Sequence, residues 1–299
     1  MTPASADAAA SLDLGGDIVV TAILGGHMRL DGGAMFGVVP KPLWERVSPP
    51  DDRNRIANAC RCLLIRTAQA TVLVDTGCGD RFNDRNRDIF AVDAAVSLEA
   101  SLAAAGVALT DITHVLFTHL HFDHSAGALR DVAGELVPTF PNAIHIVQQG
   151  EFDDALAGRS IMRSSYVAAD LDVLAGAVRW IWTDGDGPIL PGVRVQRTKG
   201  HTEHHQSVFF EGETETLVFP GDLMPTRAHL RPYWIMAYDM FPYDTFTRKQ
   251  ELAQQVQDSG WIVAWDHDPG VPWSRLAADE RTGFAAIDID ATIDATYKS

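Results

Sequence analysis

The chain has 299 residues, 46% of them apolar and 21% charged, and its formal net charge is −16. This length supplies enough apolar material for a buried core, and the composition excludes collagen-like, disordered and disulfide-scaffold proteins. An acidic surface repels phosphate backbones and anionic lipid headgroups, so neither nucleic acid nor a membrane is an expected partner. No apolar run approaches 18 residues, so no transmembrane helix is expected.

The first 16 residues lack the basic and apolar regions of a signal peptide, and we predict that they form a mobile arm. The chain has three cysteines, Cys60, Cys62 and Cys78. An odd number of cysteines without an export signal favours a reducing compartment. The sequence therefore predicts a cytoplasmic protein.

Short strand patterns and helix patterns follow one another along the chain. Strands are predicted at 17–24, 60–67, 71–75, 112–118, 143–147, 178–182, 193–198, 206–211, 215–219 and 261–265, and helices at 94–105, 148–156, 163–174 and 245–257. Strands in hairpins that then alternate with helices favour a mixed α/β layered fold. We find no Pro/Ser-rich linker, so we predict a single domain over 1–299.

One stretch, 31–58, contains several Gly and Pro residues together with Met35, Phe36 and Trp44. Loops of this length without their own secondary structure are uncommon and usually functional. The apolar side chains argue against disorder. We therefore predict a lid-like loop that covers a pocket.

The segment ITHVLFTHLHFDHSAG, at 112–127, carries His119, His121, Asp123 and His124 directly after a predicted strand. Imidazole nitrogens and carboxylate oxygens both bind zinc at about 2.0–2.2 Å. Three further candidate ligands, His201, Asp222 and His267, each follow another apolar strand. Because one turn cannot complete two metal shells, these side chains are expected to join it.

These motifs resemble those of the metallo-β-lactamase fold hydrolases, which have a four-layer αββα sandwich and a dinuclear metal site. The resemblance rests on VLVDTGCGD at 72–80, THLHFDH at 118–124, KGH at 199–201, PGD at 220–222 and DHD at 266–268. Segments at 25–44 and 221–242 are similar to the YtnP-like quorum-quenching lactonases, whose members open acyl-homoserine lactones. The resemblance also implies a homodimer, with the 31–58 loop near its interface.

The resemblance assigns a role to each ligand position. His119, His121 and His201 would hold one divalent metal, Asp123, His124 and His267 the second, and Asp222 would bridge the two. Asp75 and His205 would orient ligands without touching metal. Zinc is the expected ion, and Mn, Co and Fe remain alternatives because nitrogen and oxygen ligands accept them all.

Two divalent ions lower the pKa of bound water to about 7, so a bridging hydroxide would be the nucleophile. Acyl-homoserine lactonases have a tyrosine three residues after the bridging aspartate, where this chain has Pro225. The proton donor is then Tyr233, Tyr238 or Asp123. The apolar pocket is predicted to be formed by Met35, Phe36, Phe122, His229, Trp234, Met236 and Tyr238.

Such a pocket suits a small apolar lactone or ester, and the sequence predicts an enzyme that opens N-acyl-homoserine lactones. A promiscuous aryl ester or organophosphate triester hydrolase is the alternative, since the same hydroxide attacks phosphorus. An iron-dependent dioxygenase is a third hypothesis, because some enzymes of this kind have the same fold.

Overall fold

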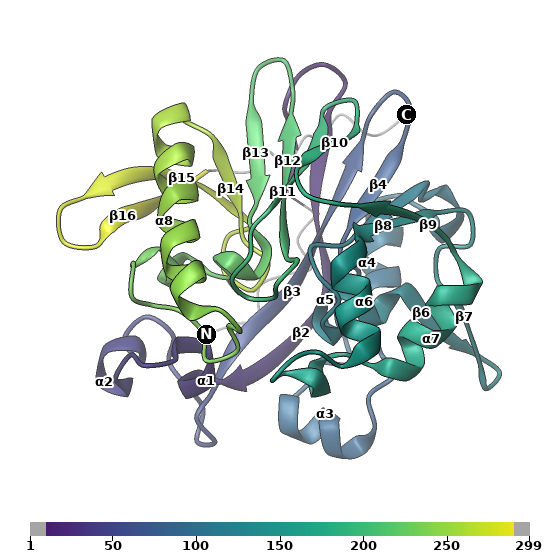
Figure 1. The fold of residues 1–299 in the computed structure, drawn as a ribbon, viewed down its shortest axis with the longest axis horizontal. Helices are drawn as coiled ribbons and strands as arrows, with labels where there is room; N and C mark the ends of the chain where they lie inside the picture. The colour runs from purple at the N-terminus through teal and green to yellow at the C-terminus, as the bar shows by residue number, and fades with distance from the viewer. Residues whose placement is uncertain (1–9, 290–299) are drawn as a thin grey trace.

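The computed structural model describes residues 10–289. Most of their strands belong to two seven-stranded sheets (Figure 1). The first sheet has the order β1 (Ser11–Asp13), β2 (Val19–Asp31), β3 (Arg55–Arg66), β4 (Thr71–Val74), β5 (His114–Leu116), β8 (Ile144–Gln148) and β9 (Arg179–Thr183). The second has the order β10 (Gly187–Leu190), β11 (Val193–Arg197), β12 (Gln206–Glu211), β13 (Thr216–Phe219), β14 (Ile262–Ala264), β15 (Trp273–Asp279) and β16 (Gly283–Asp288). A separate hairpin joins β6 (Leu129–Val132) to β7 (Glu135–Pro138).

The inner faces of the two sheets share one core. Leu63 and Leu116 of the first sheet pack in the same buried cluster as Phe210 and Leu217 of the second. These strands are apolar on both faces because helices cover their outer sides. The helices α4 (Leu98–Ala104), α6 (Gln149–Ala157) and α7 (Ala168–Ala177) pack on the first sheet, and α8 (Pro242–Ser259) packs on the second. This αββα order confirms the predicted fold class (Figure 1).

The direction of the strands gathers the candidate ligands at one edge of the sandwich. In the first sheet β4 and β5 are parallel, and in the second β13 is parallel to β14. Two antiparallel pairings relate β11 to β13, so these strands also run in the same direction. Loops after parallel neighbours emerge at the same edge, and each of these strands is followed by a candidate site residue.

The N-terminal arm is shorter than the sequence predicts. Ser11–Asp13 form β1, paired with β2, and Leu14 is fully buried between the sheets. Burial of this leucine holds the segment against the second sheet, where the N–H groups of Thr214 and Glu215 donate to the Leu14 carbonyl. Residues 1–9 of the predicted arm lie outside the described residues.

The stretch 31–58 has more regular structure than a lid-like loop. It contains α1 (Gly32–Phe36) and α2 (Lys41–Trp44), and its last residues begin β3. Met35, Phe36 and Trp44 are buried with Ile56 and Met236 in a compact cluster. The apolar residues that argued against disorder therefore build a small core of their own. Two further helices, α3 (Asp84–Phe90) and α5 (Phe122–Ser125), contact β2 and β3, respectively.

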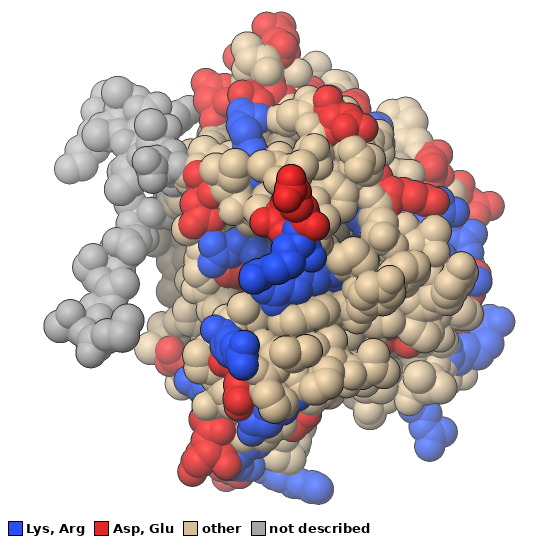
Figure 2. Space-filling model, turned by 90° about the vertical axis from the view of Figure 1, so that its left-hand side faces the viewer, with Lys and Arg blue, Asp and Glu red and all other residues tan. Residues whose placement is uncertain are grey.

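Surface charge is unevenly distributed over the side of the molecule that carries α8 and β16. Basic side chains gather near the centre of this face and acidic ones lie around them (Figure 2). Arg227 pairs with Asp288 at 2.9 Å and Arg275 with Glu215 at 2.7 Å. The strongly negative net charge thus coexists with a face where opposite charges are paired. Among residues 10–289, no helix combines the length and apolarity needed to cross a bilayer.

Candidate metal centre and adjoining pocket

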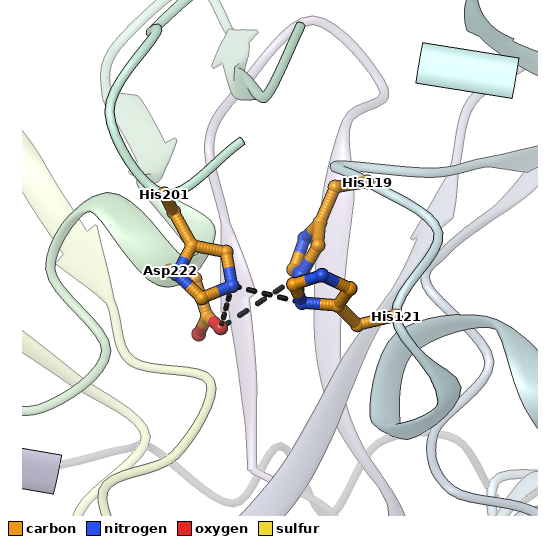
Figure 3. A group of neighbouring side chains, drawn as sticks. All are labelled: His119, His121, His201 and Asp222. Atoms are coloured by element: carbon orange, nitrogen blue, oxygen red, sulfur yellow. Dashed lines mark hydrogen bonds and ion pairs between the residues drawn. The ribbon is translucent and has the colours of Figure 1, made fainter. Parts of the chain in front are cut away.

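Four predicted ligands form the first cluster: His119, His121, His201 and Asp222 (Figure 3). Nδ1 of His121 lies 3.1 Å from Nε2 of His119 and 2.9 Å from Nε2 of His201. Oδ2 of Asp222 lies 3.0 Å from Nε2 of His201. All four side chains are buried. Three ring nitrogens and one carboxylate oxygen thus converge on one point, a donor set that suits a divalent cation.

The second cluster consists of His124, Asp222, Asp266 and His267, whose ligand atoms lie within 4.8 Å of one another. Nε2 of His267 lies 3.1 Å from Oδ1 of Asp222. Asp123, the predicted ligand in this position, lies beside the cluster, with its Oδ2 3.5 Å from Nε2 of His267. Asp222 therefore faces both clusters, with Oδ2 beside His201 of the first and Oδ1 beside His267 of the second. This is the position that the sequence predicts for a bridging ligand.

Several buried polar atoms in the second cluster have no hydrogen-bond partner among the described residues. They are Nε2 of His124, Nε2 of His267, Oδ1 of Asp222 and Oδ2 of Asp266. Buried polar atoms are normally satisfied, so a group of orphans that face one another indicates a missing partner. A divalent cation satisfies all of them at once, because each atom carries a lone pair. The residues of the second cluster therefore fit a divalent cation, as the donor set of the first cluster also does.

Burial prepares two histidines of the first cluster to bind a cation. Burial lowers the pKa of His119 and of His121 well below the ordinary value, so both rings are neutral at pH 7. Neutral imidazole is the form that binds metal. Burial opposes the charge on Asp222, but His201 and His267 hold the pKa of this carboxyl well below its usual range. Asp222, which the sequence predicts as the bridging ligand, is accordingly a carboxylate.

The ligands are held in place by side chains behind them. Nδ1 of His124 donates to Oδ2 of Asp75 at 2.9 Å, and Asp75 also accepts the Thr118 N–H at 2.8 Å. Nε2 of His205 accepts the Asp222 N–H at 3.2 Å. Gly221 has a φ of 56°, and a Cβ there would lie 2.8 Å from Nε2 of His205. A glycine must therefore precede Asp222.

Sequence reasoning missed two carboxylates behind the ligands. Oδ1 of Asp239 lies 3.0 Å from Nδ1 of His201. The buried Glu151 accepts the Leu120 N–H and the hydroxyls of Tyr166 and Thr202. Asp239 lies within the segment at 221–242 that resembles lactonases. This resemblance is the one sequence feature that could have pointed to Asp239 as a site residue. Glu151 lies in the helix α6 with no motif to mark it.

A cavity of about 450 Å³ opens over the clusters and is bounded by His121, Asp123, His201, Asp222 and His267. Four of the predicted pocket residues line it: Met35, Phe122, Met236 and Tyr238. Leu30, Phe82 and Phe90 add apolar surface that the sequence did not predict. The lining also includes polar residues: Arg81, which pairs with Asp170, and Asn83, Asn86, Ser164 and Ser165.

Phe36, His229 and Trp234, also predicted to line the pocket, instead lie behind it. Phe36 stacks on His229 at 5.1 Å and meets Trp234 edge-on at 5.3 Å between ring centroids. Nε2 of His229 donates to the Met35 carbonyl at 2.8 Å. Burial lowers the pKa of His229 to about 3, so the ring is neutral. Successive residues in a helix point about 100° apart, so Met35 reaches the cavity while Phe36 packs between Trp44 and His229.

Residues 55–267 match the profile of the metallo-beta-lactamase superfamily. The chain belongs to this superfamily. Membership confirms the resemblance seen in the sequence motifs, which extend from Asp75 to His267.

One relative in sequence and two solved structures with a similar fold are informative. The chain is 27% identical over 166 residues to the N-acyl homoserine lactonase AiiA of Bacillus thuringiensis subsp. kurstaki, a match that covers 51% of this chain and 58% of the relative. Its fold is similar to that of a probable metal-dependent hydrolase from Staphylococcus aureus, with 32% identity, a TM-score of 0.84, and coverage of 93% of this chain and 99% of that one. It is also similar to AidC, a dizinc quorum-quenching lactonase, with 19% identity, a TM-score of 0.75, and coverage of 95% and 99%.

Proposed function

We propose that this chain is a metal-dependent hydrolase that opens lactone rings, with N-acyl-homoserine lactones as the substrate class. The observation that carries the proposal is the cavity of about 450 Å³, with the two clusters at its base and an apolar wall beside them. A cavity of this size encloses a small ligand, and its apolar wall suits an acyl chain. The lactonase relatives support the same substrate class.

The first ion would be held by His119, His121, His201 and Asp222, and the second by Asp123, His124, His267 and Asp222. When bound, two divalent ions supply a nucleophilic hydroxide at neutral pH and polarise the carbonyl that is attacked. Zinc is the first candidate, as in the dizinc relative, and Mn, Co and Fe also suit these ligands. The remaining step, delivery of a proton to the leaving group, is assigned to a side chain of the protein.

Among the three proton donors that the sequence leaves open, the geometry favours Tyr238, with Asp123 as a second donor. Tyr238 and Asp123 both line the cavity. Tyr233 is 73% exposed and stacks on Phe246, outside the lining. Burial raises the pKa of Tyr238, so its hydroxyl keeps the proton that the departing alkoxide needs.

An aryl ester or organophosphate triester is the second candidate substrate. Three rings, of Phe82, Phe90 and Phe122, form an aromatic cluster with centroids 5.4–6.2 Å apart. Phe82 meets Phe122 edge-on, an arrangement that leaves ring faces and edges for a further aromatic group. This cluster lines the cavity, so an aryl leaving group would be accommodated as well as an acyl chain.

The test is proton release in weak buffer by the metal-loaded protein, with a panel of acyl-homoserine lactones and an aryl phosphotriester. We expect lactone turnover with kcat/KM of about 10⁴ M⁻¹s⁻¹ or more, the ordinary range for an enzyme on its substrate. The variants His121→Ala and Asp222→Asn should abolish it, since each removes a ligand of the first cluster. Turnover of the triester alone would move the assignment to the second candidate, and turnover of neither would overturn both.

A further inference from the structure

Asp266 is a buried carboxylate with one unused oxygen. The residue follows β14 and is 1% exposed. Its Oδ1 accepts the N–H of His267 at 2.8 Å, which fixes the orientation of the side chain. Its Oδ2 is buried and has no hydrogen-bond partner among the described residues. An unpartnered oxygen on a buried carboxylate is costly, so the fold is expected to provide a partner for it.

The unused oxygen faces the second cluster. Oδ2 of Asp266 lies 3.9 Å from Nε2 of His267. His267 donates from Nδ1 to the Ala59 carbonyl at 2.7 Å, and His124 donates from Nδ1 to Asp75. Both rings therefore turn Nε2 toward the space that Oδ2 of Asp266 also borders. Two atoms that each bind one ion at about 2.1 Å lie at most about 4.2 Å apart, so this separation permits shared coordination.

We propose that Asp266 is a direct ligand of the ion held by His124, His267 and Asp222. This inference rests on the metal centre of the proposed function. The second site then has three carboxylates, from Asp123, Asp222 and Asp266, against two imidazoles. The first site has three imidazoles and the single carboxylate of Asp222. The two positions thus differ in the balance of oxygen and nitrogen ligands.

This imbalance gives the two sites different preferences among metals. Oxygen ligands suit Mn²⁺ better than they suit softer ions, whereas imidazole suits zinc. We therefore expect the preference for Zn²⁺ over Mn²⁺ to be smaller at the second site than at the first. Asp222 is shared between the two ions, so without Asp266 only two carboxylates neutralise their positive charge. With Asp266 there are three, and more of that charge is neutralised.

The neighbouring Asp268 provides a matched control. It is also buried, but its carboxylate accepts hydrogen bonds from the side chain of Arg227 at 3.1 Å and 3.3 Å and from the Gly270 N–H at 2.9 Å. Its oxygens are therefore engaged away from the clusters. Replacing Asp268 changes a buried acid near the site without removing a proposed ligand.

The experiment counts metal ions bound by the full-length protein, without substrate. The wild type and the variants Asp266→Asn, Asp266→Glu and Asp268→Asn are stripped with chelator and titrated with Mn²⁺ or Zn²⁺. Bound metal is measured by mass spectrometry, and Mn²⁺ pairs are detected by electron paramagnetic resonance. We expect two ions and a spin-coupled Mn²⁺ pair in the wild type and in Asp268→Asn.

The Asp266→Asn variant should retain one ion and bind the second at least ten-fold more weakly, with the larger loss for Mn²⁺. Asp266→Glu, which keeps a carboxylate, should recover part of this affinity. The metal-free Asp266→Asn protein should melt above the metal-free wild type, because it no longer buries an unpaired carboxylate. If Asp266→Asn binds two Mn²⁺ ions with wild-type affinity, Asp266 is not a ligand. This outcome is independent of lactone turnover, whose absence would overturn only the proposed function.

Discussion

Oδ1 of Asp239 lies 3.0 Å from Nδ1 of His201, on the side of the ring opposite to the first cluster. The other oxygen of Asp239 accepts the Met236 N–H at 3.1 Å, so the carboxylate joins a ligand to the segment that lines the cavity. A carboxylate behind a metal-binding histidine fixes its tautomer and raises its basicity. Through this pair, the segment after β13 fixes the orientation of His201, which lies in the loop after β11.

Asp239→Asn should therefore weaken metal binding by about 10–100-fold, because the amide orients His201 less firmly and does not raise its basicity. Competition with a chromophoric chelator measures the affinity. Asp244→Asn, a partly exposed acid at the start of α8 that pairs with Lys199, is the control and should bind metal as the wild type does. Equal affinities in both variants would contradict this role for Asp239.

Tyr238→Phe should lower kcat for lactone opening by about 100-fold or more, the usual contribution of a positioned proton donor. KM should change little, since the ring that lines the cavity remains. Tyr233→Phe removes an exposed hydroxyl outside the cavity and should leave kcat unchanged. Steady-state kinetics with one lactone decide the matter. A Tyr238→Phe enzyme with full kcat would leave Asp123 as the donor.

Phe36→Ala should destabilise the fold by about 3–5 kcal/mol, because the ring is fully buried between Trp44 and His229. Denaturant unfolding measures this loss, and the variant should still bind two ions. The comparison is Phe82→Ala, whose partly exposed ring lines the cavity. This second variant should mainly raise KM. A large rise in KM for Phe36→Ala without loss of stability would instead indicate that Phe36 lines the pocket.

Stability should depend on pH through His145, a fully buried histidine whose ring nitrogens have no hydrogen-bond partner among the described residues. Burial lowers its pKa from 6.5 to about 4. As pH falls through this interval, the unfolded chain binds a proton that the folded chain does not. Folding free energy is therefore lost between pH 6.5 and pH 4, by about 3 kcal/mol, and the loss stops below pH 4.

His145→Phe should remove this part of the acid sensitivity, because a phenyl ring packs beside Phe117 and Trp180 without a titrating group. Unfolding in denaturant at pH 7.5 and pH 4.5, with wild type and variant compared at each pH, isolates the contribution. The variant should lose less stability than the wild type on acidification. An equal loss in both proteins would show that other groups account for the acid sensitivity.

Local patterns predicted a mixed α/β fold and the motif residues that the structure brings together, and the resemblance of the motifs implied the αββα sandwich. His119, His121 and His124 follow one strand within six residues, and a strand end is where a parallel sheet presents its loops. His201, Asp222 and His267 were found by the same rule. They could be identified although they lie far apart along the chain, because each follows its own apolar strand and sharp turn.

Shorter elements and the extent of strands were harder to predict. The pattern at 17–24 continues as β2 to Asp31, across a shift of register between Leu24 and His27. Glycines at 25 and 26 interrupt the pattern that alternation would reveal. The strand is held there by its long pairing with β3, a contact between distant residues. No local sequence signal reports such a pairing.

The sequence by itself determined a mixed α/β fold and the ligand motifs, because each depends on residue type and spacing within short segments, and the resemblance of these motifs to a known family implied the superfamily. Only the tertiary structure decided which of two adjacent side chains, Met35 or Phe36, reaches the cavity. It alone showed that Tyr238 lines the cavity while Tyr233 is exposed, and that Asp266 turns an unused oxygen toward the second cluster. These distinctions depend on how segments far apart in the chain pack together, and packing sets the burial and direction of each side chain.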